Sequence, residues 1–239
     1  MTRTGVVAAL EAEARTLRKL PDDFVVTVSG MGPERAYRAA KRLVDSGASA
    51  LVSWGSAAAL DATLAPGALI VPRTIADSAR NVYPVSAEWH ESVVYALHAA
   101  RIHTGAIAET SSTLVTADDK TALARRTRSA AADMESAAVA KAARELGVPF
   151  IAIRAISDAA DAAVPPRLAN AVGANGEIDV ARGVARLLVA PWHWPAAVRL
   201  GFSFRAALLA LRVAAPALYA SAAMHAEPFG AHETLLSLR

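Results

Sequence analysis

The chain has 239 residues and a mass of 24.8 kDa, which suits one large α/β domain, alone or with an appendage. Hydrophobic residues make up 54% and charged residues 20%, so the composition excludes a disordered chain. The net charge is only +3 and no run of Lys or Arg stands out, which argues against a nucleic-acid partner. Since Cys is absent, the sequence excludes disulfides, a thiol nucleophile and a zinc–thiolate site, and it predicts a cytoplasmic protein.

Apolar runs typical of buried strands alternate with Ala-rich helical patterns along most of the chain. The predicted strands are Thr4–Leu10, Phe24–Ser29, Ala50–Trp54, Ala68–Pro72, Ile102–Ala108 and Phe150–Ile156. The predicted helices are one that opens at Glu11, then Glu34–Ser46, Met134–Leu146 and Ile178–Val189. This alternation predicts an α/β fold of three layers, α/β/α, with a central mixed, largely parallel sheet.

The sequence changes character after about residue 190, so we assign residues 1–190 to the α/β domain and 191–239 to an apolar C-terminal extension. Pro191–Pro195 breaks the preceding helix, and an apolar stretch with three spaced arginines follows. Residues 191–215 are expected either to pack as a core or oligomer-forming helix or to make peripheral contact with a membrane. No window of about 20 residues lacks a charge, so we expect no spanning helix. Ser221–Arg239 is predicted to be a loosely held tail.

Polar residues and glycines cluster at the predicted carboxyl ends of the strands. They are Glu11 and Glu13, Gly30–Gly32, Gly55-Ser56 and Ser157-Asp158. Because ligands gather at the carboxyl ends of strands in such sheets, these residues predict one shared site. The glycine turn lacks the third glycine of a dinucleotide fingerprint, since Arg35 takes its place, so a turn that brings backbone amides near a ligand is favoured.

Each charged residue taken alone also has a purely structural interpretation. Asp133-Met134-Glu135 opens a helix, where acidic side chains are favourable, and Ser157-Asp158 could form a helix N-cap. Arg154 is harder to explain in this way, because an arginine buried in an apolar strand needs a carboxylate partner.

Five segments in this order resemble the nucleoside phosphorylase/nucleosidase superfamily. They are GVVAALEAE (Gly5–Glu13), SGMG (Ser29–Gly32), GSAAAL (Gly55–Leu60), DMES (Asp133–Ser136) and RAISD (Arg154–Asp158). The resemblance covers residues 3–188 and is strongest to the methylthioadenosine/S-adenosylhomocysteine nucleosidases. It implies cleavage of a purine N-glycosidic bond, which leaves an anionic base and a cationic sugar.

The resemblance implies two catalytic roles, protonation of the base and activation of the nucleophile. Asp158 would protonate purine N7 with Ser157 orienting it, and burial or a neighbouring carboxylate would have to raise its pKa for acid work near neutrality. Glu13 and Arg154, with Ser56 nearby, would position and activate the nucleophile.

The remaining motif residues are implied to bind the substrate. Glu135 would hold the ribose hydroxyls and favour the developing cation. Met31 and Met134 would form apolar walls, next to Gly32 of the glycine turn. Asp133 also belongs to this group, although the family usually has Glu there. Residues 111–116 are expected to contact the purine, and neither a metal nor a cofactor is implied.

Several alternatives stay open at this level. Water is preferred as nucleophile because a phosphate loop is not evident, yet phosphate is a possible co-substrate. The short stretch Arg73–Ala108 and the basic, apolar extension resemble the hopanoid-associated branch, which implies adenosylhopane as the substrate and a location at the inner face of the membrane. The alternatives are a methylthioadenosine/S-adenosylhomocysteine nucleosidase, a purine-nucleoside-binding module without chemistry, or a structural protein. The resemblance also implies a homo-oligomer.

Overall fold

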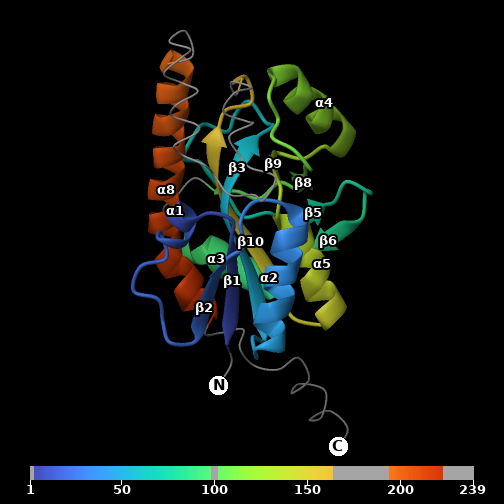
Figure 1. The fold of residues 1–239 in the computed structure, drawn as a ribbon, viewed down its shortest axis with the longest axis vertical. Coiled ribbons are helices and arrows are strands. Elements are labelled where there is room, and N and C mark those ends of the chain that lie inside the picture. Colours follow the sequence, from blue (N-terminus) through green and yellow to red (C-terminus); the bar gives the residue numbers. More distant parts are fainter. Residues whose placement is uncertain (1–2, 98–101, 164–193, 223–239) are drawn as a thin grey trace, which may run out of the picture.

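A computed structural model describes residues 3–97, 102–163 and 194–222 of the chain (Figure 1). The strands are β1 (Thr4–Ala8), β2 (Phe24–Val28), β3 (Ala50–Ala59), β4 (Leu69–Ile70), β5 (Thr74–Ala76), β6 (Val82–Pro84), β7 (Ile102–His103), β8 (Ile107–Glu109), β9 (Ala131–Asp133) and β10 (Phe150–Asp158). The helices are α1 (Glu11–Ala14), α2 (Pro33–Asp45), α3 (Ala87–Ala96), α4 (Ala117–Thr127), α5 (Ser136–Leu146) and α8 (Trp194–Ala222). All described strands belong to one mixed sheet.

The long strand β3 joins two parts of the sheet. Its first half lies parallel to β1, which in turn pairs in parallel with β2, and nearly its whole length runs parallel to β10. Its last residues, Ala58 and Ala59, pair antiparallel with β9, which continues to β8, β5 and β6. Beyond β10 the sheet ends with β4 and β7. The carboxyl ends of β1, β3 and β10 therefore meet at the same edge.

Helices cover both faces of the sheet, because alternate strand side chains point in opposite directions. In β10, Phe150 and Ala152 join the apolar cluster beneath α2 and α5, whereas Ile151 and Ile153 join the cluster beneath α3 and α8. Figure 1 shows α2 and α5 on one side of the sheet and α8 on the other. The predicted three-layer α/β/α fold with a mixed, largely parallel sheet is confirmed.

Two strand predictions differ from the structure. The third strand was expected to end at Trp54, but β3 continues through Gly55 to Ala59 because β10 and then β9 supply backbone partners there. The single strand expected at Ile102–Ala108 is two short strands, β7 and β8, which pair with β4 and with β5 and β9. Periodicity along the chain does not report which strand supplies the hydrogen bonds.

One predicted helix begins later in the structure, and another cannot be compared with it. The helix expected from Met134 begins at Ser136, since Met134 and Glu135 turn toward the pocket described below. The helix expected at Ile178–Val189 lies outside the described residues, as does the proposed boundary at residue 190. Ser221 and Ala222, placed in the predicted tail, are the last two residues of α8.

Helix α8 has two different faces. Ala207, Leu211, Ala214 and Leu218 are buried against the sheet and α3, so this face belongs to the core of the α/β domain. The opposite face exposes apolar side chains, namely Val198, Phe202, Leu209 and Val213. By length and composition alone, Val198–Ala222 is apolar enough to cross a membrane. In the fold, however, one side of the helix is already occupied by protein.

Candidate active site

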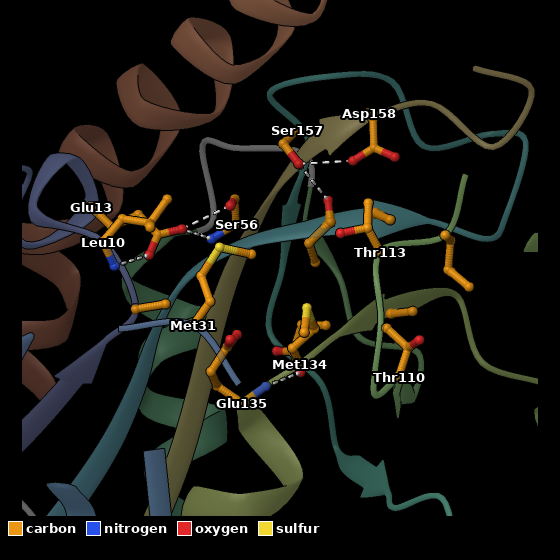
Figure 2. Close-up of a pocket in the computed structure, with 16 residues that line it drawn as sticks. Leu10, Glu13, Met31, Ser56, Thr110, Thr113, Met134, Glu135, Ser157 and Asp158 are labelled. Carbon is orange, nitrogen blue, oxygen red and sulfur yellow. Dashed lines mark hydrogen bonds between the residues drawn. The ribbon is translucent and has the colours of Figure 1, made fainter. Parts of the chain in front are cut away.

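An open cavity of about 140 Å³ lies where β1, β3 and β10 end (Figure 2). The turn between β9 and α5 and the loop after β8 complete its wall. The lining residues are Ala9, Leu10, Glu13, Met31, Ser56, Ala57, Ala58, Thr110, Thr113, Leu114, Ala132, Asp133, Met134, Glu135, Ser157 and Asp158. The expectation that strand ends share one site therefore corresponds to a real concavity.

Glu13 is held on one side of the cavity by the strand that faces it. It lies on α1, which follows β1 after two residues, and it is 2% exposed. Its Oε1 accepts hydrogen bonds from the Ser56 amide (2.8 Å) and hydroxyl (2.7 Å), while Oε2 accepts one from the Leu10 amide (3.1 Å). Burial raises the pKa of Glu13 above its usual value, although the nearby Arg154 guanidinium opposes this shift.

Glu135 joins the turn before α5 to the glycine turn after β2. Its Oε1 accepts a hydrogen bond from the Gly32 amide at 2.8 Å, and Gly32 has φ of 106°, a conformation that favours glycine. Burial raises the pKa of Glu135 to about 7; Arg154 lowers it and the Asp133 carboxylate raises it further. A proton can therefore stay on this carboxyl group near neutral pH.

Arg154 lies beneath the cavity rather than in its wall. Its Nε is 2.6 Å from Asp133 Oδ2, and its Nη2 donates to the hydroxyls of Ser53 (2.6 Å) and Ser136 (3.0 Å). Asp133 also accepts hydrogen bonds from the amides of Glu135 and Ser136 at the start of α5. Asp133 is thus both the carboxylate partner that a buried arginine requires and a cap for the helix.

The third nitrogen of Arg154 lies close to Gly55, on the side of Glu13. Nη1 has no hydrogen-bond partner among the described residues. A Cβ added at Gly55 would overlap Nη1 and lie 2.9 Å from both carboxylate oxygens of Glu13. Gly55 therefore allows the guanidinium and the Glu13 carboxylate to approach each other across β3. One donor of Arg154 is left for a further acceptor on that side.

Asp158 lies on the other side of the cavity, at the end of β10 (Figure 2). The Ser157 hydroxyl donates to its Oδ1 at 2.9 Å, which is the orienting contact expected from the sequence. The ammonium group of Lys120 on α4 lies 2.6 Å from its Oδ2. Of the two expected influences on Asp158, burial or a neighbouring carboxylate, the described residues place no carboxylate but a cation in contact with it, and the side chain is 12% exposed.

The structure places most of the predicted site residues in the lining of one cavity. Those that line the cavity are Glu13, Met31, Ser56, Asp133, Met134, Glu135, Ser157 and Asp158. Gly32 contributes through its amide, and Arg154 through Asp133. Of the loop expected to contact the purine, Thr113 and Leu114 line the cavity.

Three polar residues whose side chains contact the charged groups of the site were not predicted as functional. Ser136 is part of the DMES motif and could have been noticed there, because it follows the two acids directly. Ser53 lies within an apolar strand, and its contact with Arg154 depends on strand pairing. Lys120 is one of several charged residues on its helix, and nothing in the local sequence separates it from them.

The fold has many solved relatives at low sequence identity. A methylthioadenosine/S-adenosylhomocysteine nucleosidase from Neisseria meningitidis, in complex with methylthio-immucillin-A, is similar with a TM-score of 0.71 and 17% identity over 93% of this chain and 100% of that one. The futalosine hydrolase of Helicobacter pylori gives 0.70 and 14% over 92% and 97%. A nucleosidase from Colwellia psychrerythraea, in complex with adenine, gives 0.70 and 17% over 92% and 95%.

The comparison with families is more specific than these structural likenesses. A search of curated proteins gives no significant match. The family model of the phosphorylase superfamily matches residues 12–188, which include the acidic residues of the cavity and most of the sheet. The resemblance read from the five motifs is thereby confirmed: this chain belongs to the phosphorylase superfamily.

Proposed function

We propose that the protein cleaves the N-glycosidic bond of an adenine nucleoside and releases adenine. The observation that carries this proposal is the placement of three acids around one cavity. Glu13 and Asp158 lie on opposite sides, and Glu135 lies below them in Figure 2. This distribution suits a reaction in which the sugar becomes cationic while the leaving base must gain a proton.

The buried acids favour the charge that develops on the sugar. As the bond to the base lengthens, positive charge collects near C1′ of the ribose. Glu13 and Glu135 are buried, so the attraction of their ionised forms for that charge is weakly screened. Met31 and Met134 supply apolar surface to the cavity wall beside them. Asp158, which Ser157 orients, would protonate the leaving base.

Water is the nucleophile that fits the Glu13 side best. A phosphate dianion would be repelled by the Glu13 carboxylate, and Arg154, the nearest cation, is already paired with Asp133. Neutral water can donate to Glu13 and accept from the free Nη1 of Arg154. Phosphorolysis is the second candidate, since that same donor could bind an anion oxygen.

We propose a nucleoside with a large apolar 5′ substituent, adenosylhopane, as the leading substrate. The exposed apolar face of α8, with Arg205 and Arg212 exposed beside Phe202 and Val213, supports contact with a lipid surface. The second candidate substrate is methylthioadenosine or S-adenosylhomocysteine. The solved nucleosidases named for those compounds, which match this chain over nearly their full length, favour it.

Adenine release measured by chromatography tests the reaction and the substrate together. Purified protein would receive methylthioadenosine and a 5′-alkyl lipid analogue of adenosine, each with and without phosphate. We expect release without phosphate, and faster release from the lipid analogue. Release that requires phosphate would make the protein a phosphorylase, and release from methylthioadenosine alone would favour the second substrate. No release from any member of the panel would contradict the proposed function.

Asp158→Asn separates an enzyme from a nucleoside-binding module. The substitution keeps the size of the side chain but removes the proton donor, so we expect adenine release to fall by about 10²–10⁴-fold. It also removes the counterion of the buried Lys120, so we expect a folded but less stable protein. Circular dichroism and thermal unfolding check the fold. A variant that releases adenine as fast as the wild type would eliminate Asp158 as the acid.

We also propose that the protein is a homo-oligomer that contacts the inner face of a membrane. Co-sedimentation with anionic phospholipid vesicles tests the contact. We expect Phe202→Ser/Val213→Ser to reduce binding, and the control Val82→Ser, at an exposed position on β6, to bind like the wild type. Equal binding of all three proteins would contradict the membrane role of α8. Light scattering that gives 24.8 kDa would contradict the oligomer.

A further inference from the structure

Lys120 is a buried cation next to the proposed general acid. Its side chain is 1% exposed although it comes from α4, whose other charged residues face solvent. The ammonium nitrogen lies 2.6 Å from Asp158 Oδ2, 2.6 Å from the Ala159 carbonyl and 3.0 Å from the Ala162 carbonyl. An ammonium group has three protons, so all of its donors are used. Lys120 thus connects α4 to the chain that follows β10.

Burial of a lysine is costly unless its charge is compensated. Among the described residues, Lys120 and Arg154 are the buried lysine and arginine side chains, and each one is paired with an acid of the cavity. Arg154 lies near Glu13 on one side of the cavity, whereas Lys120 contacts Asp158 on the other side. The cavity therefore has one fixed cation behind each of its two ends.

The ion pair raises a question about the source of the proton. Purine N7 presents a lone pair, and an ionised carboxylate presents only lone pairs. The two can form a hydrogen bond only if a proton lies between them. In the ion pair of the free protein, that proton belongs to the ammonium group, which is in direct contact with Asp158.

We propose that Lys120 is the positioning residue and the proton source for Asp158, so that the two side chains act as one acid. This inference rests on the proposed cleavage of an adenine nucleoside. Lys120 fixes the Asp158 carboxylate against the cavity and passes it the proton that the leaving base takes up.

The proposed step balances in atoms and charge. The C1′–N9 bond breaks, and its electron pair enters the purine ring. N7 takes a proton from Asp158, which regains one from Lys120, leaving a neutral amine. Water forms the new bond to C1′ and gives its proton to Glu13. Exchange with solvent then returns one proton to Lys120 and removes one from Glu13.

The test compares a leaving group that needs a proton with one that does not. The first substrate is the adenine nucleoside that the wild-type protein cleaves in the panel above, and the second is 4-nitrophenyl β-D-riboside, whose phenolate leaves without protonation. For Lys120→Met we expect kcat/KM on the nucleoside to fall about 10–100-fold, mainly through kcat. The rate on the nitrophenyl riboside should change less than about threefold. Lys41→Met, which removes an exposed ion pair with Asp45, is the matched control.

A second variant keeps the proposal open to refutation if Lys120→Met does not fold. Lys120→Arg keeps the buried charge but does not release a proton, so the nucleoside rate should fall while the nitrophenyl riboside rate persists.

Three results would overturn the role of Lys120. Equal losses on both substrates would show that Lys120 only holds the fold together. A nucleoside rate that stays unchanged or rises would show that the cation is not needed by Asp158 or opposes it. If the wild-type protein cleaves the nitrophenyl riboside but no adenine nucleoside, the proposed function fails and the inference fails with it. If the wild-type protein cleaves an adenine nucleoside and Lys120→Met cleaves it equally fast, the role of Lys120 fails but the proposed function stands.

Discussion

Three buried carboxyl groups share a single guanidinium at the centre of the site. Glu13, Asp133 and Glu135 are each at most 6% exposed, and Arg154 contacts only Asp133 as an ion pair. One positive charge is not sufficient to stabilise three buried negative charges. Burial raises the pKa values of Glu13 and Glu135, and for Glu135 the neighbouring carboxylates of Asp133 and Glu13 raise it further. The same excess of negative charge is what a cationic sugar would relieve.

Glu135→Gln should make the protein less sensitive to rising pH. The pKa of Glu135 rises from 4.5 to about 7 on folding, so the folded state retains a proton that the unfolded state has lost. Stability is therefore full below about pH 4.5 and falls as the pH rises through 7. At about 1.4 kcal/mol per pH unit, the loss reaches roughly 3 kcal/mol by pH 8.

Gln is neutral at every pH and should escape this loss. Urea unfolding at pH 5 and pH 8 measures the effect, with Glu34→Gln at an exposed position of α2 as the control. The free energy of unfolding of Glu135→Gln relative to wild type should increase between the two pH values. An unchanged difference would mean that Glu135 is already ionised at pH 5.

Arg154→Met should destabilise the protein by about 3–5 kcal/mol, because it leaves the Asp133 carboxylate buried without its cation. Denaturant unfolding at neutral pH measures the cost. The double variant Arg154→Met/Asp133→Asn removes both charges and should recover part of the lost stability. A double variant that is less stable than the single one would show that the ion pair is not the origin of the loss.

The sequence predicted individual site residues better than it predicted their partners. Glu13, Glu135 and Asp158 belong to local motifs next to strand ends, so their place in one cavity follows from the order of the strands. The contact between Lys120 and Asp158 joins positions 38 residues apart, through a helix whose side-chain orientation the sequence does not state. Burial or a neighbouring carboxylate was expected to raise the pKa of Asp158, and the fold places a lysine beside it.

At the scale of elements, α8 changes how the C-terminal segment must be tested. The segment was interpreted as an extension, yet Leu211 and Leu218 are fully buried against the domain. Deletion of residues 191–239 would therefore remove part of the core as well as any membrane-binding surface. Substitutions on one face of the helix separate these two effects.

Leu211→Ala and Val213→Ala compare the two faces within a single turn. Leu211 is fully buried, so its truncation should cost about 2–5 kcal/mol of stability. Val213 is 67% exposed, and its truncation should change stability by no more than about 0.5 kcal/mol. Urea unfolding of both variants measures the difference. Similar costs at the two positions would mean that α8 packs differently in solution.

Apolar periodicity located the central strands and the helices α2 and α5, but it missed α3, α4, β5, β6 and β9 and some element ends. The helix at α2 was predicted within one residue at each end, because a proline opens it and its apolar positions recur on one face. The predicted strand ended before Gly55, because a glycine normally indicates a turn, whereas β3 continues to Ala59. Here that glycine makes room for Arg154 and Glu13 inside a continuing strand.

At the scale of the whole molecule, the cavity joins segments from nearly the full described length of the domain. Its wall includes residues from α1, β3, β9 and β10. A ligand that contacts all of them binds the folded state and not the unfolded chain. Binding should therefore stabilise the domain as a unit.

Adenine at about 100 times its dissociation constant should add about 2.7 kcal/mol of stability. For a domain of this size, that corresponds to an increase in Tm of about 5 to 10 °C. Differential scanning fluorimetry with increasing adenine measures the shift, and Asp158→Ala should show a smaller one. Equal shifts in both proteins would place the base away from Asp158.

The sequence by itself determined the fold class, the family and the positions of the principal acids. These properties depend on local apolar runs and short motifs, which are present in the chain before it folds. The tertiary structure alone decided which charge stands next to which acid. It paired Asp133 with Arg154, placed Lys120 behind Asp158 and buried one face of α8. Such contacts depend on strand pairing and helix packing between distant segments, because the charge state of a buried group is set by its neighbours in space.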